Sequence, residues 1–325
     1  MDTALSLQNI RKTFGKTVAV EGMDLVVPKG ALYGVIGPNG AGKTTCIRMI
    51  MAILFQDSGT LSVLGKRSAL EAKDRIGYLP EERGVYRKMR VGAFLTYIAQ
   101  LKGVSREEAE ARVPVLLRRV GLPETINTRC EDLSKGMLQR IQFVAAVIHK
   151  PDLLILDEPF SGLDPVSVRL LRDQVLEEHR RGATVLLSTH VMTHAEEICQ
   201  HVVMIHQGRK VLDEPVAGLR RQYDPRTLLF EPLVADADVS AIARLPGVDR
   251  IEPEIGGGYR IALAQGVEPA SIIPRVAAAV PAARVELSRL RLEDVFIRIV
   301  SGGLQVGEAE RLRATLTPEA QGASA

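Results

Sequence analysis

The chain has 325 residues, 46% of them hydrophobic and 25% charged, a balance that is ordinary for globular proteins. Its length predicts about two domains. The formal net charge is only +3 and no Lys/Arg-rich block occurs, so composition argues against a nucleic-acid partner. No run approaches the ~18 consecutive apolar residues that a membrane-spanning helix needs, so a role at a membrane would require a partner protein.

Cysteine usage and the first residues indicate the cellular compartment. The cysteines number 3, an odd count, and none forms a CxxC pair. The start of the chain, Met1–Ala4, lacks the charged and then apolar pattern of a secretion signal. We therefore expect reduced thiols and a cytoplasmic protein.

Residues 5–32 predict short strands with turns at 14–16 and 27–30. Phe14 is the aromatic residue of the first turn. An aromatic side chain ahead of a phosphate site can stack on a nucleobase, but in a strand-rich segment it can equally pack in a core. The residues alone leave both interpretations of Phe14 open.

A glycine-rich stretch follows at 37–44. The apolar run 32–36 predicts a strand buried on both faces, and apolar residues recur at helical spacing afterwards as far as Leu54. Glycines let backbone N–H groups approach an anion, Lys43 can reach the β and γ phosphates, and the Thr44 hydroxyl can bind Mg²⁺. We expect a phosphate-binding loop at a helix N-terminus and not a chance glycine-rich turn. The residues expected to contact the nucleotide here are Gly37, Pro38, Asn39, Gly40, Ala41, Gly42, Lys43, Thr44 and Thr45.

A helical insertion is predicted after the phosphate loop. Its second helix starts at Ser105, whose spacing to Glu108 forms a capping box, and Pro114 should kink that helix. The other predicted elements before residue 130 are strands within 56–65 and 75–80 and a helix over 91–101.

Two further buried strands end in groups that can do chemistry. The run 153–156 is followed at once by Asp157 and Glu158, and the run 184–189 by His190. Because the carboxyl ends of parallel strands meet at one edge of a sheet, we expect these side chains near the phosphate loop. There the first carboxylate can hold Mg²⁺, the second can polarise water, and the imidazole can contact the γ-phosphate. An acidic loop and a structural histidine are the alternatives. Structural or exposed roles are expected for His149, His194, His201 and His206.

The pattern changes after about residue 222. Short alternating runs and helical segments follow in the order strand, helix, strand, strand, helix, strand, which predicts a small α+β domain with a ferredoxin-like sheet over 223–302. We find no catalytic grouping in this domain, so regulatory, dimer-stabilising and partner-docking roles are open. Residues 303–325 predict a flexible tail.

Over about residues 4–220 the sequence resembles the ATP-binding cassette of ABC transporters. The phosphate loop, the carboxylate pair, the loop 161–164 and His190 are similar in order and spacing to that family's Walker A, Walker B, D-loop and switch-histidine elements. Most specific is the segment 133–140, LSKGMLQR, which resembles the family signature LSGGQ at the start of a helix.

The resemblance implies an α/β fold of P-loop NTPase type over 1–222, with a mainly parallel sheet, an antiparallel β subdomain and a helical subdomain at about 82–140. It implies that the chain binds ATP and Mg²⁺ and that Phe14 stacks on adenine. The catalytic residues would be Lys43, Glu158 and His190; the further nucleotide contacts Ser134, Gly136 and Asp164; and the metal ligands Thr44, Asp157 and Glu81.

Two departures from the family pattern stand in this site. Lys135 and Met137 replace a glycine and a glutamine of the signature, which adds a positive charge and removes a polar contact. Glu81 replaces the glutamine that senses Mg²⁺, and its carboxylate can still bind a metal. Both variants resemble cassettes of ABC-2 exporters.

The resemblance therefore implies an ATPase that pairs with a second cassette, as a homodimer, around two ATP molecules and drives an integral membrane permease of ABC-2 export type. Such a subunit is cytoplasmic and peripheral on the inner face of the cell membrane. An importer cassette uses the same ATP site and is the nearest alternative. A soluble ABC ATPase and a non-transport P-loop kinase are less compatible, since one cassette is present without a long heptad run, and a kinase needs no signature segment.

Overall fold

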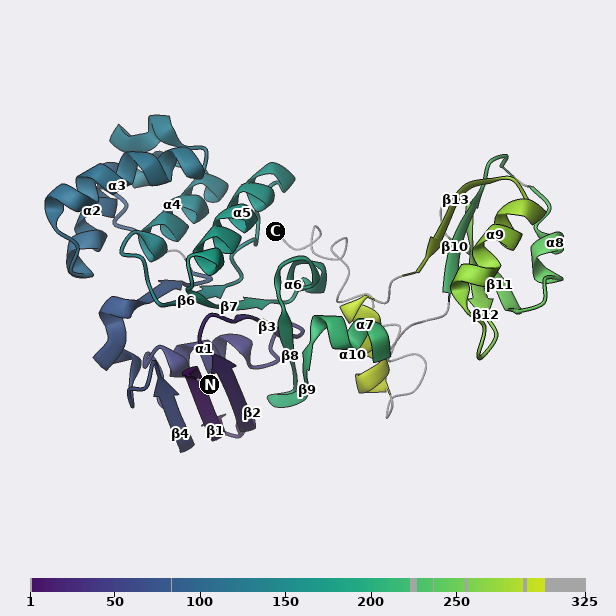
Figure 1. Cartoon of the computed structure of the whole chain (residues 1–325). Coiled ribbons are helices and arrows are strands. Elements are labelled where there is room, and N and C mark those ends of the chain that lie inside the picture. Colours follow the sequence, from purple (N-terminus) through teal and green to yellow (C-terminus); the bar gives the residue numbers. More distant parts are fainter. Residues whose placement is uncertain are drawn as a thin grey trace. The chain divides into compact units, whose positions relative to one another are not determined.

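The computed structural model describes residues 2–82, 84–222, 227–235, 237–254, 257–288 and 291–301. The predicted tail, 303–325, lies outside these residues. The chain divides into two compact units, one of Met1–Val216 together with the chain from Phe296 on, and one of Ala217–Val295 (Figure 1).

Six strands form the central sheet of the first unit: β3 (Leu32–Ile36), β5 (Ile76–Leu79), β6 (Leu153–Asp157), β7 (Thr184–Thr189), β8 (His201–His206) and β9 (Arg209–Pro215). Their order is β5-β6-β7-β3-β8-β9, and every neighbouring pair except β8 and β9 is parallel. Strands β3, β6 and β7 are buried along their whole length, which explains their unbroken apolar runs. The predicted parallel strands are confirmed.

Helices cover both faces of this sheet: α1 (Lys43–Ile50), α4 (Lys135–Val147), α5 (Pro165–Arg180) and α6 (Met192–Ile198). Figure 1 shows α1 on one face, and α4 and α5 on the other. Strands β6, β7 and β3 run parallel to one another. Their carboxyl ends therefore lie at the same edge of the sheet. That edge carries the candidate site.

An antiparallel sheet with the order β2-β1-β4 lies on the α1 side: β1 (Thr3–Phe14), β2 (Thr17–Pro28) and β4 (Ser58–Val63). The predicted strands and the turns at 14–16 and 27–30 are confirmed, but the expectation that the strands are short is wrong, because β1 and β2 are each 12 residues long. The pairing of β1 with β2 has a register shift between Leu7 and Ile10, and both strands continue past it. Leu5, Leu7, Ile47 and Val203 join this sheet, α1 and the central sheet in one core.

Helix α1 is shorter than its apolar pattern predicts. It ends at Ile50, because Ala52 adopts a left-handed backbone with φ of 55° and the chain turns there. Ile53 is consequently 60% exposed and does not extend the apolar face of the helix. The predicted continuation to Leu54 is wrong.

The helical insertion contains α2 (Val91–Leu101), α3 (Arg106–Arg119) and the 3₁₀ segments η2 (Pro123–Asn127) and η3 (Cys130–Asp132), whereas the 3₁₀ segment η1 (Ala69–Arg75) precedes β5. The Glu108 amide donates to Ser105 Oγ at 3.2 Å, which confirms the predicted helix start. The Glu108 carboxylate pairs with Arg112, one turn along the helix. Helix α3 continues through Pro114 as one element.

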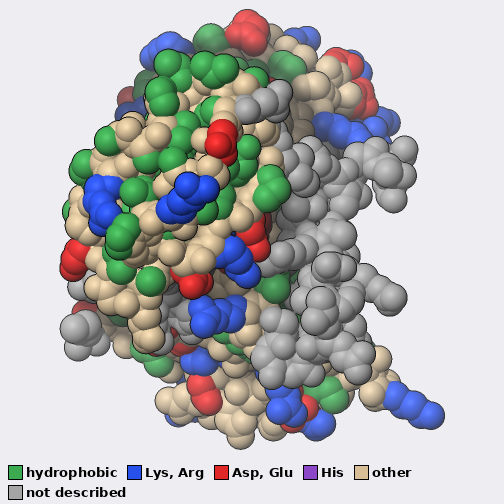
Figure 2. All heavy atoms as spheres, turned by 90° about the vertical axis from the view of Figure 1, so that its right-hand side faces the viewer, with side chains coloured by type: hydrophobic (Ala, Val, Ile, Leu, Met, Phe, Trp, Pro, Cys, Tyr) green, Lys and Arg blue, Asp and Glu red, His purple; other side chains and the backbone are tan. Residues whose placement is uncertain are grey.

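The second unit is a four-stranded antiparallel sheet with the order β11-β12-β10-β13. The predicted strand and helix order is confirmed, and the sheet order is that of a ferredoxin-like fold. Its core contains Phe230 and Val276, and on the opposite face Arg284 pairs with Glu231 at 3.2 Å. Basic, acidic and apolar side chains are interspersed on the face drawn in Figure 2. The elements are β10 (Thr227–Pro232), α8 (Ser240–Ala243), β11 (Val248–Glu254), β12 (Gly258–Leu263), α9 (Pro269–Ala279) and β13 (Ala282–Leu287), preceded by α7 (Val216–Gln222).

The last helix, α10 (Leu292–Ser301), carries the chain back to the first unit. Its residues from Phe296 on belong to that unit, whereas the sequence placed all of 223–302 in the small domain. Phe296 is fully buried, with its ring 5.6 Å from that of His206 at the end of β8. Across the described part of the chain, no helix has the length and apolar character needed to span a bilayer.

The cysteines give a test of this core. Burial raises the pKa of Cys46 and of Cys199 to about 12, and the pKa of buried Cys130 is also raised. Because the thiolate is the reactive form, iodoacetamide at pH 8 should leave all three native thiols unmodified and should label them after unfolding in urea. Mass spectrometry measures the number of adducts. Rapid labelling of Cys46 or Cys199 in the native protein would contradict the packing around α1 and α6.

Candidate active site

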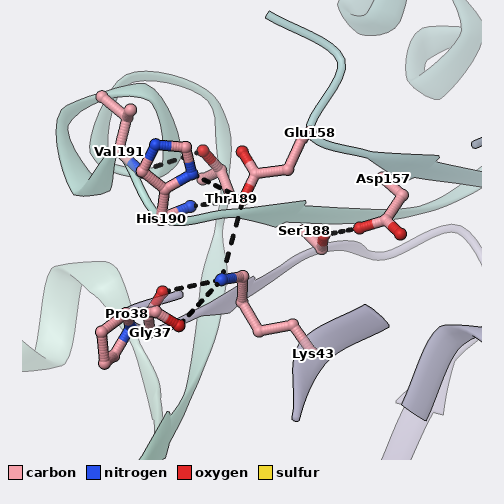
Figure 3. A network of polar contacts seen from close by, with 9 residues as sticks. All are labelled: Gly37, Pro38, Lys43, Asp157, Glu158, Ser188, Thr189, His190 and Val191. Carbon is pink, nitrogen blue, oxygen red and sulfur yellow. Dashed lines mark hydrogen bonds and ion pairs between the residues drawn. The ribbon is translucent and has the colours of Figure 1, made fainter. Parts of the chain in front are cut away.

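Lys43, Glu158 and His190 come from three separate elements and form one network at the carboxyl edge of the central sheet (Figure 3). Lys43 Nζ lies 3.7 Å from Glu158 Oε1, and both side chains are only 6% exposed. The same carboxylate oxygen accepts from the His190 backbone N–H at 2.9 Å and contacts His190 Nδ1 at 2.8 Å. The strand ends therefore bring a cation, a carboxylate and an imidazole together.

Glu158 is held by its backbone as well as by its side chain. It follows β6 directly and has a φ of 49°, a left-handed conformation that is uncommon for a residue with a side chain. Its N–H donates to the Ser188 carbonyl at 3.0 Å, which fixes this turn against the end of β7. The turn directs the carboxylate toward Lys43 instead of along the strand.

The phosphate loop is a close-packed backbone cradle. A Cβ added at Gly37 would collide with the Ile205 carbonyl oxygen, and one added at Gly42 would lie 2.5 Å from the Ala19 carbonyl oxygen. Gly42 also has a φ of 106° where α1 begins. Only glycine fits these two positions, so the loop N–H groups can converge on an anion at the helix N-terminus.

The Lys43 ammonium bonds to its own loop in this arrangement. It donates to the carbonyl oxygens of Gly37 at 2.8 Å and Pro38 at 3.1 Å. Burial lowers the pKa of Lys43, while the negative charges of Glu158, Asp157 and Glu81 oppose that shift. The lysine is thus a desolvated cation bonded to two neutral carbonyl oxygens and close to one carboxylate.

Asp157 has the properties of a metal ligand. Ser188 donates to its Oδ1, but its buried Oδ2 has no hydrogen-bond partner. Burial raises the pKa of Asp157, the hydrogen bond from Ser188 opposes that shift, and the negative charges of Glu81 and Glu158 raise the pKa further. An unpartnered carboxylate oxygen near a hydroxyl suits a hard cation such as Mg²⁺. Within the described ranges no cluster of three or more His, Cys, Asp or Glu side chains is placed to hold a metal ion.

The other predicted site residues lie around this network. Glu81 is exposed after β5, yet its charge reaches Lys43 and Asp157. Phe14 is 50% exposed at the turn between β1 and β2. The remaining loop residues differ in exposure: Ala41 is buried, Thr44 and Thr45 are partly exposed, and Asn39 and Gly40 are exposed.

The signature segment does not join the network. Ser134 is the N-cap of α4 and its Oγ accepts from the Met137 N–H at 3.3 Å, and Gly136 follows in the first turn. Among the described residues neither belongs to the hydrogen-bonded group around Lys43. Asp164 caps α5 and accepts from the N–H groups of Val166 and Ser167 at 3.0 Å. The Ser167 hydroxyl also donates to it, and this bond, followed by the backbone bonds, lowers the pKa of Asp164.

Sequence reasoning missed three supporting residues. Ser188 pairs in register with Asp157 across β6 and β7, a contact signalled only by its place at the end of the next strand. Gly208 donates its N–H to the Ala41 carbonyl at 2.9 Å and so supports the phosphate loop from the β8–β9 turn. Phe160, after the carboxylate pair, has its ring 5.0 Å from that of His194 on α6.

Comparison with known proteins decides the family. Residues 20–161 match the protein family described as ABC transporter. An uncharacterised ABC transporter ATP-binding protein of Bacillus subtilis is 37% identical over 296 residues, which cover 91% of this chain and 98% of that protein. This chain belongs to the ATP-binding proteins of ABC transporters.

Two more similarities agree with this assignment. The Nod factor export ATP-binding protein I of Cupriavidus metallidurans is 37% identical over 216 residues, 66% of this chain and 71% of that protein. A solved structure of an ATP-binding subunit of an ABC transporter superposes with a TM-score of 0.63 at 32% identity and covers 68% of this chain and 93% of the other. The chain is an ABC-type ATPase with the P-loop NTPase fold, and it binds ATP.

The cradle of this ABC ATPase can be tested with two glycines of the same loop. Gly42→Ala should lower the free energy of unfolding by about 1–3 kcal/mol more than Gly40→Ala, and should weaken ATP binding more. Both positions have positive φ, 106° and 77°, but nothing lies within 4 Å of a Cβ at Gly40. Urea unfolding and equilibrium dialysis measure the two effects. Equal losses in both variants would show that crowding by Ala19 is not what makes Gly42 necessary.

Proposed function

We propose that this chain is the ATP-hydrolysing subunit of an ABC-2 exporter and that two copies close around two ATP molecules to drive an integral membrane permease. The observation that carries the proposal is the Lys43, Glu158 and His190 network beside a phosphate loop. Lys43 would exchange its bonds to the Gly37 and Pro38 carbonyls for phosphate oxygens.

The hydrolytic step assigns one task to each member of the network. Glu158 accepts a proton from a water molecule as that water attacks the γ-phosphorus and ADP leaves. Lys43 stabilises the negative charge that develops on the phosphoryl oxygens. His190 holds the Glu158 carboxylate through its N–H and ring at 2.9 and 2.8 Å, and its imidazole also supports the γ-phosphate. Positioning and charge stabilisation supply most of the rate enhancement.

Mg²⁺ would be held by Asp157 and Thr44, with Glu81 at its periphery. The fit rests on the unpartnered Oδ2 of Asp157 and on the excess of carboxylates around a single lysine. When bound, the ion neutralises phosphate charge and orients the β and γ groups. Glu81 in place of the family's glutamine adds to the local negative charge that this ion would offset.

A second copy would contribute the start of α4. Ser134 is exposed as the N-cap of this 13-residue helix, whose first N–H groups and dipole attract a phosphate. The helix also contacts the loop after Glu158, since Gln139 Nε2 donates to the Pro159 carbonyl at 3.2 Å and Gly136 packs against Leu163. Pairing of identical copies would give two equivalent pockets, each with Lys43 from one copy and Ser134 from the other.

Transport direction is inferred from the relatives, one of which is named as a Nod factor export protein. With a permease as its partner, the chain would act in the cytoplasm at the inner face of the membrane. An importer subunit is the second candidate, because the ATP site is the same in both directions. Recovery from the membrane fraction together with an integral membrane protein supports either transporter and argues against a soluble ABC ATPase.

The test of this function is Glu158→Gln. The amide keeps the shape of the side chain but cannot take up a proton, so the rate of ATP hydrolysis should fall by about 10²–10⁴-fold while ATP still binds. With Mg²⁺ and ATP the variant should accumulate as a dimer, which light scattering after size-exclusion chromatography measures.

Glu197→Gln is the matched control. Glu197 lies on α6, the helix that begins just after His190, and it pairs with Arg172 at 2.7 Å, outside the network of Lys43, Glu158 and His190. It should retain hydrolysis. Wild-type turnover by Glu158→Gln would show that Glu158 is not the base. If the variant stays a monomer under all nucleotide conditions, the proposal of a pocket formed by two copies is wrong.

A further inference from the structure

Asp57 collects three hydrogen bonds from the two residues that precede Phe14. Its Oδ2 accepts from the Thr13 N–H at 2.7 Å and from Thr13 Oγ1 at 2.6 Å, and its Oδ1 accepts from Lys12 Nζ at 2.7 Å. Asp57 lies 44 residues from Thr13 in sequence, in the segment between α1 and β4. It therefore links the chain that leaves the phosphate-loop helix to the hairpin that carries Phe14.

The hydrogen bonds of Asp57 continue the pairing along β1 beyond the point where strand β4 begins. Strand β4 pairs with β1 only as far as the partners Arg11 and Ser58, and the Asp57 N–H donates to the Arg11 carbonyl at 2.8 Å. Beyond that point the Asp57 carboxylate takes the place of a strand by accepting the Thr13 N–H. Thr13 is thereby fixed on both sides, since it also pairs with Val18 of β2.

Lys12 connects this carboxylate to the aromatic ring. Its Nζ lies 5.6 Å from the centroid of Phe14 while it bonds to Asp57, and its side chain is 15% exposed. The cation contacts one face of the ring, which limits the rotation of a side chain that is itself 50% exposed. An exposed aromatic residue at a hairpin turn would otherwise sample several rotamers.

We propose that Asp57 is a positioning residue for the nucleobase: through Thr13 and Lys12 it holds the Phe14 ring in the orientation in which a purine stacks on it. This inference rests on the proposed function, ATP binding at the phosphate loop, together with the stacking of Phe14 on adenine that the family resemblance implies. The hydrogen bonds from Lys12 and Thr13 lower the pKa of Asp57 to about 2, so the carboxylate stays ionised at physiological pH. Its contribution to binding is orientation of the ring, because a pre-oriented ring loses less rotamer freedom on binding.

A tryptophan reporter makes the stacking measurable. The chain has no tryptophan, so Phe14→Trp places a single indole at the proposed base site. ATP should quench its fluorescence, whereas inorganic tripolyphosphate, which has no base, should leave it unchanged. Combining Phe14→Trp with Asp57→Asn should reduce the quenching at saturating ATP, because the indole is no longer held.

Binding constants in the natural Phe14 background test the same point. With Mg²⁺ present, Asp57→Asn should raise the Kd for ATP about threefold to tenfold, the size of a lost aromatic stack, and change the Kd for tripolyphosphate by less than about twofold. Asp24→Asn is the matched control, since Asp24 Oδ1 accepts the Asn9 N–H of the same strand at 2.7 Å, farther from Phe14. It should change neither constant.

Each outcome decides between defined alternatives. If ATP does not quench the indole, the base contact of Phe14 in the proposed function is wrong, and the positioning role falls with it. If ATP quenches it but Asp57→Asn changes neither the quenching nor the Kd, only the role of Asp57 is overturned. Equal weakening of ATP and tripolyphosphate would show that Asp57 only stabilises the fold. Should Asp57→Asn not fold, Thr13→Val removes the hydroxyl bond alone and is subject to the same criteria.

Discussion

The buried contact between Lys43 and Glu158 is the interaction on which the active site depends. One carboxylate oxygen lies 3.7 Å from the Lys43 ammonium and accepts from the His190 N–H at 2.9 Å, so a single atom links the start of α1 to the ends of β6 and β7. Because both side chains are desolvated, each is costly without a partner, and the network holds the site together. A phosphate that binds Lys43 must compete with this carboxylate. If Glu158 is the base, as proposed, binding of the nucleotide would release it from Lys43.

The elements around this network are arranged to support it from several directions. The β8–β9 turn supports the phosphate loop through Gly208, and Phe296 of α10 lies against His206 at the same end of β8. The start of α4 contacts the loop after Glu158 through Gln139. If a second copy binds at the start of α4, the contact would act on the loop that follows Glu158. The start of α4 therefore contacts the loop after Glu158, and α10 contacts the end of β8 through Phe296.

Much of the fold and of the candidate site was predictable from the sequence, because Asp157, Glu158 and His190 lie at the ends of strands that the sequence indicates. The glycines before Lys43 indicated the phosphate loop, and the apolar runs before that loop and before Glu158 indicated the buried strands. What could not be predicted depends on register and on distant contacts. Ser188 reaches Asp157 only because β6 and β7 pair in one register, and Asp57 reaches Thr13 across 44 residues. Helix α1 ends early because Ala52 adopts a left-handed backbone conformation, which the residue types in this segment did not predict.

The affinity of Glu158→Gln for ATP, measured by equilibrium dialysis without Mg²⁺, is the most direct test of the competition for Lys43. Replacing the carboxylate with a neutral amide frees the lysine for phosphate, so ATP should bind about tenfold more tightly than to the wild type, a change typical of losing one partly desolvated ion pair. ADP, which lacks the γ-phosphate, should show a smaller gain. Unchanged or weaker ATP binding would mean that Glu158 does not hold Lys43 against the nucleotide and would contradict the account.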